Sequence, residues 1–417
     1  MARKKLKIKL PKFGKALNSN RNYDEIEFSK KRKNSSAARR RAMMFRNRII
    51  AILAVFLLFL FSAYLILNFS HPVGVFEYLK YSVLSAGSGE GYNINIEGGK
   101  PIYTVSDGKV YYVVTDSTVN CYNTSGKVIF EQPHSFGNPV IKKSETRYLL
   151  YDQGEPELSV CTLSGGLYSH VFDHGIICAD ISNSGYFAVA TKVEGYDSSV
   201  SVFNKKNEKV FEWFSSNETV NAVSLSENGK TVSVATVKVE SGNFVSNVYV
   251  FKYKSATPVM QKTYSDQVVY QLLENDNRGF FAVFANKVEF LNPKKGSTVT
   301  HESEYSVSLV KQYGNRTIVV RTVAANQDNS VIEILNKKGE IVSSFEVDTH
   351  AIDIAYKSGK IYLLGRTGVY KYNVKGKLLS VAETNYDTLF IEVISDNSVA
   401  CIRSSIIEKT NLSKVEK

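Results

Sequence analysis

The sequence predicts an all-β fold, a β-propeller that follows one N-terminal transmembrane helix, and it favours eight blades over the alternative of seven. Three observations support this prediction. Strand-forming residues dominate the chain after residue 90, polar turns recur there with a period near 42 residues, and an uncharged apolar run occupies residues 49–67. A period of this length, with three or four short strands in each unit, is typical of a β-propeller.

The period is carried by a polar turn near the end of each unit. The segments "DGKVYYVVTDSTVNCYNTSGKVIFE" (107–131) and "SGKIYLLGRTGVYKYNVKGKLLSV" (358–381) share the order turn, strand, gap, strand, turn, strand. A second hairpin turn recurs in "DISNSGYFAVAT" (180–191) and "SLSENGKTVSVAT" (224–236). Asn and Gly accept the positive φ that tight hairpins require, so we expect each unit to form an antiparallel blade. The seven final turns are marked, at spacings of 40, 41, 49, 40, 43 and 37 residues, by Gly126, Gly166, Asn207, Ala256, Gly296, Gly339 and Gly376.

The two ends of the repeat region determine the number of blades. After the seventh turn, "TLFIEVISDNSVACIRSSIIEKTNL" (388–412) has the pattern of three further strands, and "YNINI" (92–96) precedes the first full unit. We expect this N-terminal strand to complete the last blade, because ring closure protects exposed strand edges. A pair of β-sandwiches and a β-solenoid are the competing architectures. The long period argues against a solenoid, and the number of strands argues against one sandwich.

The apolar run "IIAILAVFLLFLFSAYLIL" (49–67) predicts a transmembrane helix. Nineteen helical residues span roughly 28 Å, close to the thickness of the hydrocarbon core. The basic flank "RRRAMMFRNR" (39–48) precedes the run, and no Lys or Arg follows it until Lys80, so the positive-inside rule places the N-terminus in the cytoplasm. A cleaved signal peptide would have a shorter n-region and a shorter apolar run. A buried core helix would show polar positions within the run.

The positive charge belongs to the N-terminal tail and not to the predicted propeller. Residues 1–48 carry a net charge of +14, whereas the rest of the chain carries −2. We expect this tail to be cytoplasmic and largely disordered. Its basic blocks "KKLKIKLPKFGK" (4–15) and "KKRKNSSAARRRAMMFRNR" (30–48) are suited to contact with anionic lipids, to a cytoplasmic protein or nucleic-acid partner, or to setting topology alone. Nucleic acid is the least favoured of these partners.

Residues 68–90 form a predicted juxtamembrane linker between the span and a propeller over residues 91–412. Within it, "VFEYLKYSVL" (75–84) has apolar residues at helical spacing, which predicts a short amphipathic helix on the outer membrane face. The Gly- and Ser-rich "SAGSGEG" (85–91) predicts a flexible joint.

These repeats resemble the PQQ-like and WD40-like propellers. The segment 107–131 is similar to the blade of quinoprotein-like propellers, and 224–236 is similar to the hairpin of other propellers. The order of basic tail, span, linker and propeller resembles that of uncharacterised single-span surface proteins of Gram-positive bacteria. The chain departs from these families because Trp213 is its one tryptophan and the Gly-His and Trp-Asp pairs of WD40 blades are missing. No functional residue is therefore transferred from either family.

Four cysteines lie in the region predicted to be extracytoplasmic, and none has CxxC spacing. Equivalent points on neighbouring repeats are usually too far apart for a disulfide, so buried free thiols are favoured over a disulfide staple. The residues are Cys121, Cys161, Cys178 and Cys401.

The sequence predicts no catalytic, cofactor-binding or metal-binding residue, and hence no enzyme. In "HVFDH" (170–174), His170 and His174 are expected in strand-to-loop sequence, where alternate residues point apart. The segment "ENDNRG" (274–279) lacks the alternating carboxylates of a calcium loop and predicts a hairpin turn. The N-x-S/T triplets that follow the apolar run are expected to occur by chance, and they begin at Asn68, Asn123, Asn217, Asn315 and Asn411.

The favoured function is a membrane-anchored propeller outside the cytoplasm that acts as a docking platform for another protein of the cell envelope. The alternative is a propeller that binds a small molecule or glycan, with hydrolytic or sensory roles less favoured. No cofactor is expected. The predicted partners are the lipid bilayer and an envelope protein.

Overall fold

The structure is a computed structural model that describes residues 17–70, 72–275, 278–322 and 328–415. It divides into two units, Met1–Ser70 and His71–Lys417. In the first, helix α1 (Leu17–Ser70) contains a stretch, Arg39–Ile66, that is long and apolar enough to be a candidate membrane span. The basic segment 4–15 lies outside the described residues.

Helix α1 begins well before the apolar run, so the structure differs from the largely disordered tail predicted for residues 1–48. Residues 37–44, "AARRRAMM", are all good helix formers. An apolar helix that follows them supplies the nucleus whose formation is the costly step in helix growth, and adding residues to it is cheap.

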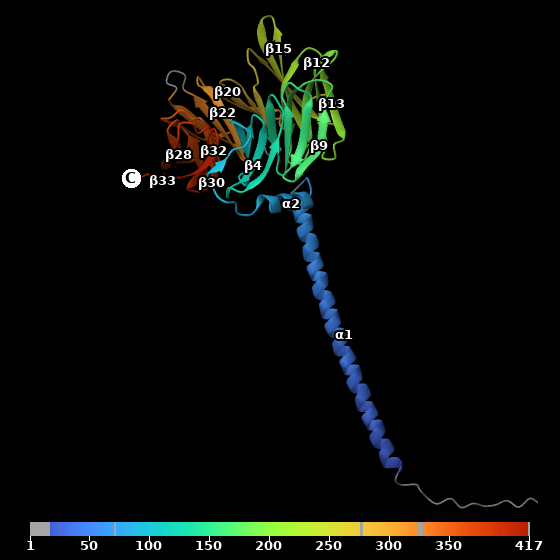
Figure 1. Cartoon of the computed structure of the whole chain (residues 1–417). Coiled ribbons are helices and arrows are strands. Elements are labelled where there is room, and N and C mark those ends of the chain that lie inside the picture. The colour runs from blue at the N-terminus through green and yellow to red at the C-terminus, as the bar shows by residue number, and fades with distance from the viewer. Residues whose placement is uncertain (1–16, 71, 276–277, 323–327, 416–417) are drawn as a thin grey trace, which may run out of the picture. The chain divides into compact units, whose positions relative to one another are not determined.

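The second unit is a ring of antiparallel sheets preceded by helix α2 (Val75–Ser85). Among the described residues the strands form eight sheets, so the propeller has eight blades, as predicted (Figure 1). In each blade the first strand lines the central channel and the fourth is the outermost. Blade 1 consists of β2 (Pro101–Ser106), β3 (Val110–Thr115), β4 (Thr118–Asn123) and β5 (Val128–Pro133), and blade 2 of β6 (Pro139–Lys143), β7 (Arg147–Asp152), β8 (Glu157–Thr162) and β9 (Gly165–Val171). Blade 3 consists of β10 (Ile176–Ile181), β11 (Phe187–Val193), β12 (Tyr196–Phe203) and β13 (Lys209–Ser215), and blade 4 of β14 (Thr219–Leu225), β15 (Thr231–Glu240), β16 (Asn243–Lys252) and β17 (Met260–Ser265).

The remaining blades follow the same order, and the last is completed from the start of the ring. Blades 5 to 7 are β18 (Gln271–Asn275), β19 (Gly279–Val283), β20 (Lys287–Asn292), β21 (Ser297–Glu302); β22 (Ser306–Tyr313), β23 (Arg316–Thr322), β24 (Ser330–Asn336), β25 (Ile341–Val347); and β26 (Asp353–Lys357), β27 (Lys360–Leu364), β28 (Gly368–Asn373), β29 (Leu378–Glu383). Blade 8 is β30 (Phe390–Ser395), β31 (Ser398–Ile402), β32 (Ile406–Asn411) and β1 (Ile94–Asn95).

Ring closure takes the form that the sequence predicted. Strand β1 pairs antiparallel with β32, with Ile94 opposite Ile407. The red strands of blade 8 therefore lie beside the cyan start of the ring in Figure 1. A short strand, β33 (Ser413–Lys414), adds a second closure because it pairs with the outer strand β29 of blade 7. Both ends of the ring are thus held by backbone hydrogen bonds, which removes two free edges.

The core consists of eight apolar layers, one in each seam between consecutive blades, as the clusters among the described residues show. Alternate residues of a strand face the two neighbouring seams, so central strands such as β3 and β7 are buried along their whole length. Cys121 and Cys161 share the seam between blades 1 and 2, and Cys401 lies in the seam between blades 7 and 8. All four cysteines are free thiols, as favoured. Burial raises the pKa of Cys178 to about 12 and that of Cys401 to about 11, so neither is a thiolate at neutral pH.

One side-chain hydrogen-bond pattern explains the repeated turn between third and fourth strands. Asn123 Oδ1 accepts from the backbone N–H groups of Ser125 and Lys127, both at 3.0 Å. Gly126 then takes φ 80°, a conformation that side chains with a Cβ resist. Equivalent asparagines cap three other blades in the same way, at Asn204, Asn336 and Asn373. In a fourth blade, Asn292 Oδ1 accepts from the backbone N–H groups of Lys294 and Lys295. This Asn turn is the physical basis of the period that the sequence displays.

Candidate functional site

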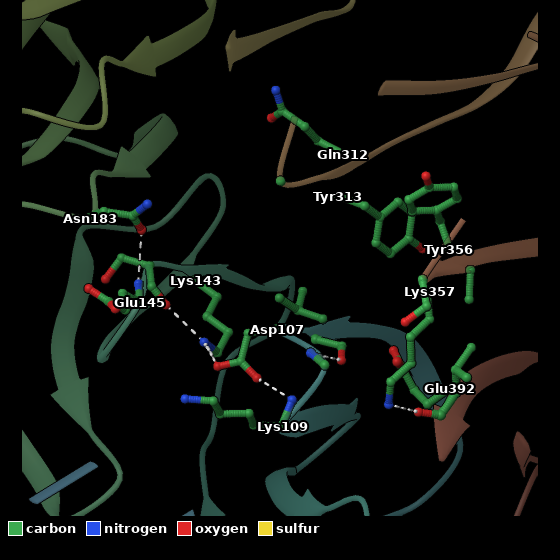
Figure 2. Close-up of a pocket in the computed structure, with 18 residues that line it drawn as sticks. Asp107, Lys109, Lys143, Glu145, Asn183, Gln312, Tyr313, Tyr356, Lys357 and Glu392 are labelled. Carbon is green, nitrogen blue, oxygen red and sulfur yellow. Dashed lines mark hydrogen bonds and ion pairs between the residues drawn. The ribbon is translucent and has the colours of Figure 1, made fainter. Parts of the chain in front are cut away.

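The strand order defines two faces of the ring. We call the mouth face the one formed by the turns that join first to second and third to fourth strands, and the far face the opposite one. A cavity of about 680 Å³ opens at the mouth face, and residues at or beside the first-to-second-strand turns of six blades line it. Figure 2 shows the lining residues that carry its polar groups, which are Asp107, Lys109, Lys143, Glu145, Asn183, Gln312, Tyr313, Tyr356, Lys357 and Glu392.

A tightly bound ion pair forms part of the wall from blades 1 and 2. Lys143 Nζ lies 2.6 Å from Asp107 Oδ2, and the Lys143 side chain is only 4% exposed. Burial by itself would raise the pKa of Asp107, but Lys143 and a hydrogen bond donated by Tyr81 Oη hold it below its ordinary value. The Asp107 carboxylate is therefore ionised at neutral pH, and it is already paired with Lys143.

A second ion pair lies beside the cavity on blades 6 and 7. Lys311 Nζ is 2.6 Å from Asp353 Oδ1, and Asp353 Oδ2 accepts a 3.1 Å hydrogen bond from the backbone N–H of Ile391 in blade 8. Burial raises the pKa of the neighbouring Glu392 to about 7, and repulsion by Asp353 adds to this while Lys311 opposes it. Glu392 is consequently the one carboxyl of the lining for which a pKa near neutral pH is resolved.

Two other lysines of the lining, Lys357 and Lys109, do not form an ion pair with a described carboxylate. Lys357 Nζ donates to the backbone carbonyls of Val393 and Ile394 at 3.2 and 3.3 Å. Lys109 Nζ lies 3.4 Å from Tyr78 Oη. Within the described part of the chain, neither ammonium group has a carboxylate oxygen within 4.0 Å.

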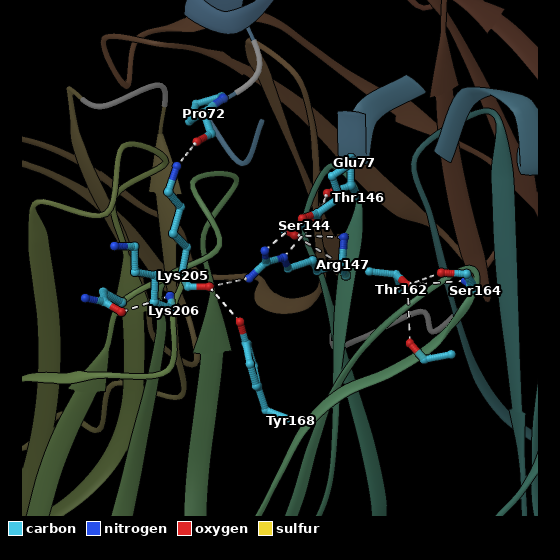
Figure 3. Close-up of polar contacts among 12 residues, drawn as sticks. Pro72, Glu77, Ser144, Thr146, Arg147, Thr162, Ser164, Tyr168, Lys205 and Lys206 are labelled. Atoms are coloured by element: carbon cyan, nitrogen blue, oxygen red, sulfur yellow. Dashed lines mark hydrogen bonds and ion pairs between the residues drawn. The ribbon is translucent and has the colours of Figure 1, made fainter. Parts of the chain in front are cut away.

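Helix α2 is fastened to the mouth face by a charged clamp (Figure 3). Glu77 Oε1 accepts from Arg147 Nε at 2.8 Å and from Thr146 Oγ1 at 2.6 Å, and Glu77 Oε2 accepts from Arg147 Nη2 at 2.8 Å. Arg147 Nη1 also donates to the Lys205 carbonyl of blade 3 at 3.2 Å. Burial alone would raise the pKa of Glu77, but Arg147 and Thr146 outweigh burial and lower it. A bidentate pair of this kind fixes orientation as well as position.

The helix predicted over residues 75–84 is confirmed, and one of its faces packs on the ring. Tyr81 is buried in the seam between blades 1 and 2, whereas Phe76 and Val83 on the other face are 81% and 74% exposed. The segment 85–91, predicted to be a flexible joint, is instead bound to blade 1, because Asn123 Nδ2 donates to the carbonyls of Ser85 and Gly87. The prediction that α2 lies on the membrane face stays a prediction.

The residues singled out in the sequence do not gather in the cavity. His170 Nε2 is 2.6 Å from Asn207 Oδ1 of the next blade, and its ring packs against Phe172 and Phe203. Asn123 is buried as a turn cap, which leaves no room for a glycan. In the described residues there is no group of three or more His, Cys, Asp or Glu side chains that would hold a metal ion. The segment 274–279 lies partly outside the described residues.

The far face carries most of the exposed aromatic side chains of the ring. The hairpin of β15 and β16, with ten residues in each strand, has the longest strands of the second unit and extends beyond the neighbouring blades in Figure 1. Val239 and Phe244 form a cross-strand pair near its tip and are 66% and 55% exposed. In the described part of the second unit, one exposed aromatic residue, Phe76, belongs to the mouth face. The far face has Tyr196, Phe214, Phe244, Tyr270 and Tyr386.

Together, the fold and the site define a β-propeller with a charged cavity at one face and an aromatic surface at the other. Residues 90–415 match the model of a family described as "Family of unknown function (DUF5711)", and the chain belongs to that family. No curated protein matches the chain.

Among similar solved structures, two of AztD support the fold alone. Apo AztD from Citrobacter koseri is 13% identical with a TM-score of 0.51, and the match covers 70% of this chain and 88% of that one. A second crystal structure of Citrobacter koseri AztD gives the same values. The β-propeller domain of Myceliophteria thermophila Cps50 (Swd1) is 12% identical with a TM-score of 0.45, over 78% of this chain and 100% of that one.

Proposed function

We propose that this protein is a single-pass membrane protein whose propeller stands outside the cytoplasm and docks another protein of the cell envelope through its far face. The apolar stretch Arg39–Ile66 and the positive charge that precedes it support anchoring with a cytoplasmic N-terminus. The basic tail would then lie near anionic inner-leaflet lipids.

One observation carries the docking role, which is the set of five exposed aromatic residues on the far face. Aromatic side chains are enriched in protein interfaces because they bury a large area at a small cost in conformational entropy. The Val239–Phe244 pair stands on a projecting hairpin, and the rings of Tyr196 and Phe214 are 4.9 Å apart. Such side chains contribute most when a partner covers them from solvent.

The test compares the full-length protein with single variants in a crosslinking and capture experiment in cells. Phe244→Ser and Tyr386→Ser change exposed residues of the far face, and Phe76→Ser changes an exposed aromatic residue of α2 as the matched control. We expect one envelope protein to be captured by the wild type and by Phe76→Ser, with at least a tenfold loss in the far-face variants. Capture that ignores the far-face changes, or the absence of any captured protein, would contradict docking at this face.

Topology is tested separately with introduced cysteines, since three of the native thiols are buried and Cys178 is half-buried. Ser88 and Lys30 are both exposed, and both lie outside the stretch Arg39–Ile66. In intact cells, an impermeant maleimide should label Ser88→Cys but not Lys30→Cys, and permeabilisation should make both reactive. The parent protein controls for labelling of the native cysteines. The opposite pattern would reverse the proposed orientation.

A further inference from the structure

The mouth cavity has the volume of a small-ligand site, and its walls carry both signs of charge. A volume of about 680 Å³ falls within the usual range of ligand pockets. In Figure 2, Lys109 and Glu145 lie toward one side of the cavity, and Lys357 and Glu392 lie toward the other. These residues come from blades 1, 2, 7 and 8, which are far apart in the sequence and adjacent in the ring.

Most of the charged groups near the cavity are already committed to structural partners. Asp107 is bound by Lys143 and Tyr81, and Asp353 is bound by Lys311 and by two backbone N–H groups. Replacing these partners would break interactions that hold neighbouring blades together. A ligand is therefore expected to use the groups that remain.

Two of the remaining groups lie together on the wall from blades 7 and 8. Glu392 forms no ion pair with any described cation within 4.0 Å, and the nearby Lys311 pairs with Asp353. A hydrogen bond with Ser106 lowers the pKa of Glu392 in part but supplies no positive charge. Lys357 gives two of its N–H groups to the carbonyls of Val393 and Ile394, and an ammonium group has three. This wall thus offers one carboxylate acceptor and one cationic donor at neighbouring positions.

We infer that this wall binds a zwitterionic small molecule of the amino-acid or short-peptide class, with its ammonium group on Glu392 and its carboxylate on the third N–H of Lys357. The rest of the ligand extends toward Lys109 and Glu145. A ligand with charge of only one sign leaves either Glu392 or Lys357 desolvated beside a like charge, which weakens binding. A zwitterion satisfies both groups, and it returns Glu392 to its ionised form by placing a cation beside it. The inference does not depend on docking at the far face.

The experiment uses three forms of one probe, with the full-length protein in nanodiscs and binding measured by titration calorimetry at pH 7. The probes are L-alanyl-L-alanine, its N-acetyl derivative, which is only anionic, and its C-terminal amide, which is only cationic. We expect the zwitterion to bind at least tenfold more tightly than either blocked form. Equal binding of all three, preferential binding of a blocked form, or no binding at millimolar concentration would each overturn the inference.

Variants then locate the site. Glu392→Gln keeps the shape of the side chain and should weaken binding of the dipeptide at least tenfold, and it should abolish the advantage over the N-acetyl form. Lys357→Met tests the other contact, with thermal unfolding as the measure of folding because two hydrogen bonds are also lost. Glu90→Gln, at an exposed residue outside the cavity, is the matched control. Wild-type affinity in Glu392→Gln would exclude this wall as the site. Wild-type affinity in Phe244→Ser would show that the cavity acts independently of docking.

Discussion

The clamp between α2 and the ring gives the sharpest energetic prediction. Replacing Glu77 by Gln removes the negative charge that faces Arg147, whose side chain is only 6% exposed. Removing one partner of a buried pair usually costs about 3–5 kcal/mol. Glu77 is 22% exposed, the amide oxygen still accepts one hydrogen bond, and Arg147 keeps the Lys205 carbonyl. We therefore expect a cost of about 2 kcal/mol, which corresponds to about a 30-fold change in an equilibrium constant.

The loss should appear as opening of α2 and not as unfolding of the ring, because α2 contributes through Tyr81 to one apolar seam, the one between blades 1 and 2. Hydrogen exchange on the full-length protein at pH 7 should show amides of residues 78–85 exchanging about 30-fold faster, with the amides of blades 4 to 8 unchanged. The exposed Glu90→Gln variant provides the same chemical change without the clamp. Folding lowers the pKa of Glu77, so its contribution is present above the unfolded-state pKa and is lost as pH falls through the folded-state pKa. Exchange in α2 equal to wild type at pH 7 would refute the assignment of the clamp.

Three further predictions concern the ring. Glu392→Gln removes a carboxyl group whose pKa is about 7 in the folded state. A raised carboxyl pKa makes the stability of the wild type fall as pH rises from about 4.5 to 7, so the variant should be up to about 3 kcal/mol more stable than wild type at pH 8. Denaturant unfolding measures this difference, and parallel pH profiles of the two proteins would contradict the prediction. Gly229→Ala, at φ +63°, places a Cβ 2.6 Å from the ring of Tyr186 and should lower the free energy of unfolding by about 2–3 kcal/mol. Gly314→Ala, at φ +56° in open space, is the control and should lower it by only about 1 kcal/mol. Equal melting temperatures of the two variants would contradict the steric argument. Ile407→Ala removes a fully buried side chain from the closing blade and should cost about 2–5 kcal/mol in the same unfolding assay, and a loss below about 1 kcal/mol would show that the β1 closure is dispensable.

The architecture was predictable because each blade must solve the same local problem. An Asn that caps its own turn and a Gly at positive φ leave a mark every 40 residues or so, as at Asn123–Gly126 and Asn373–Gly376. The closing strand was predictable for a related reason, since three strands at one end and one at the other leave edges that only each other can cover. The recurring Asn–Gly turn and the pairing of the two end segments together were sufficient to predict the number of blades.

The chemistry of the cavity was not predictable, because its residues share one position in the repeat and not a residue type. They lie at or beside the turn between first and second strands, where the charged and polar side chains differ from blade to blade. Glu392 follows Asp107 by almost the whole length of the ring, and the two line one cavity because blade 8 lies beside blade 1. Helix α2 illustrates a second limit, because its apolar spacing predicted a helix, and only the bidentate contact of Glu77 with Arg147 shows which face packs on the ring.

The separation of the two faces follows from how a blade is built. Turns between first and second strands form the mouth, whereas turns between second and third strands and the connections between blades form the far face. Between them lie the seams, in which side chains such as Val113 and Ile407 are completely buried. Changes at Glu392 and at Phe244 therefore lie on opposite sides of a close-packed layer that deforms little. Ligand binding at the mouth and docking at the far face should thus be independently mutable, and any coupling between them would have to pass through the polar residues that line the channel.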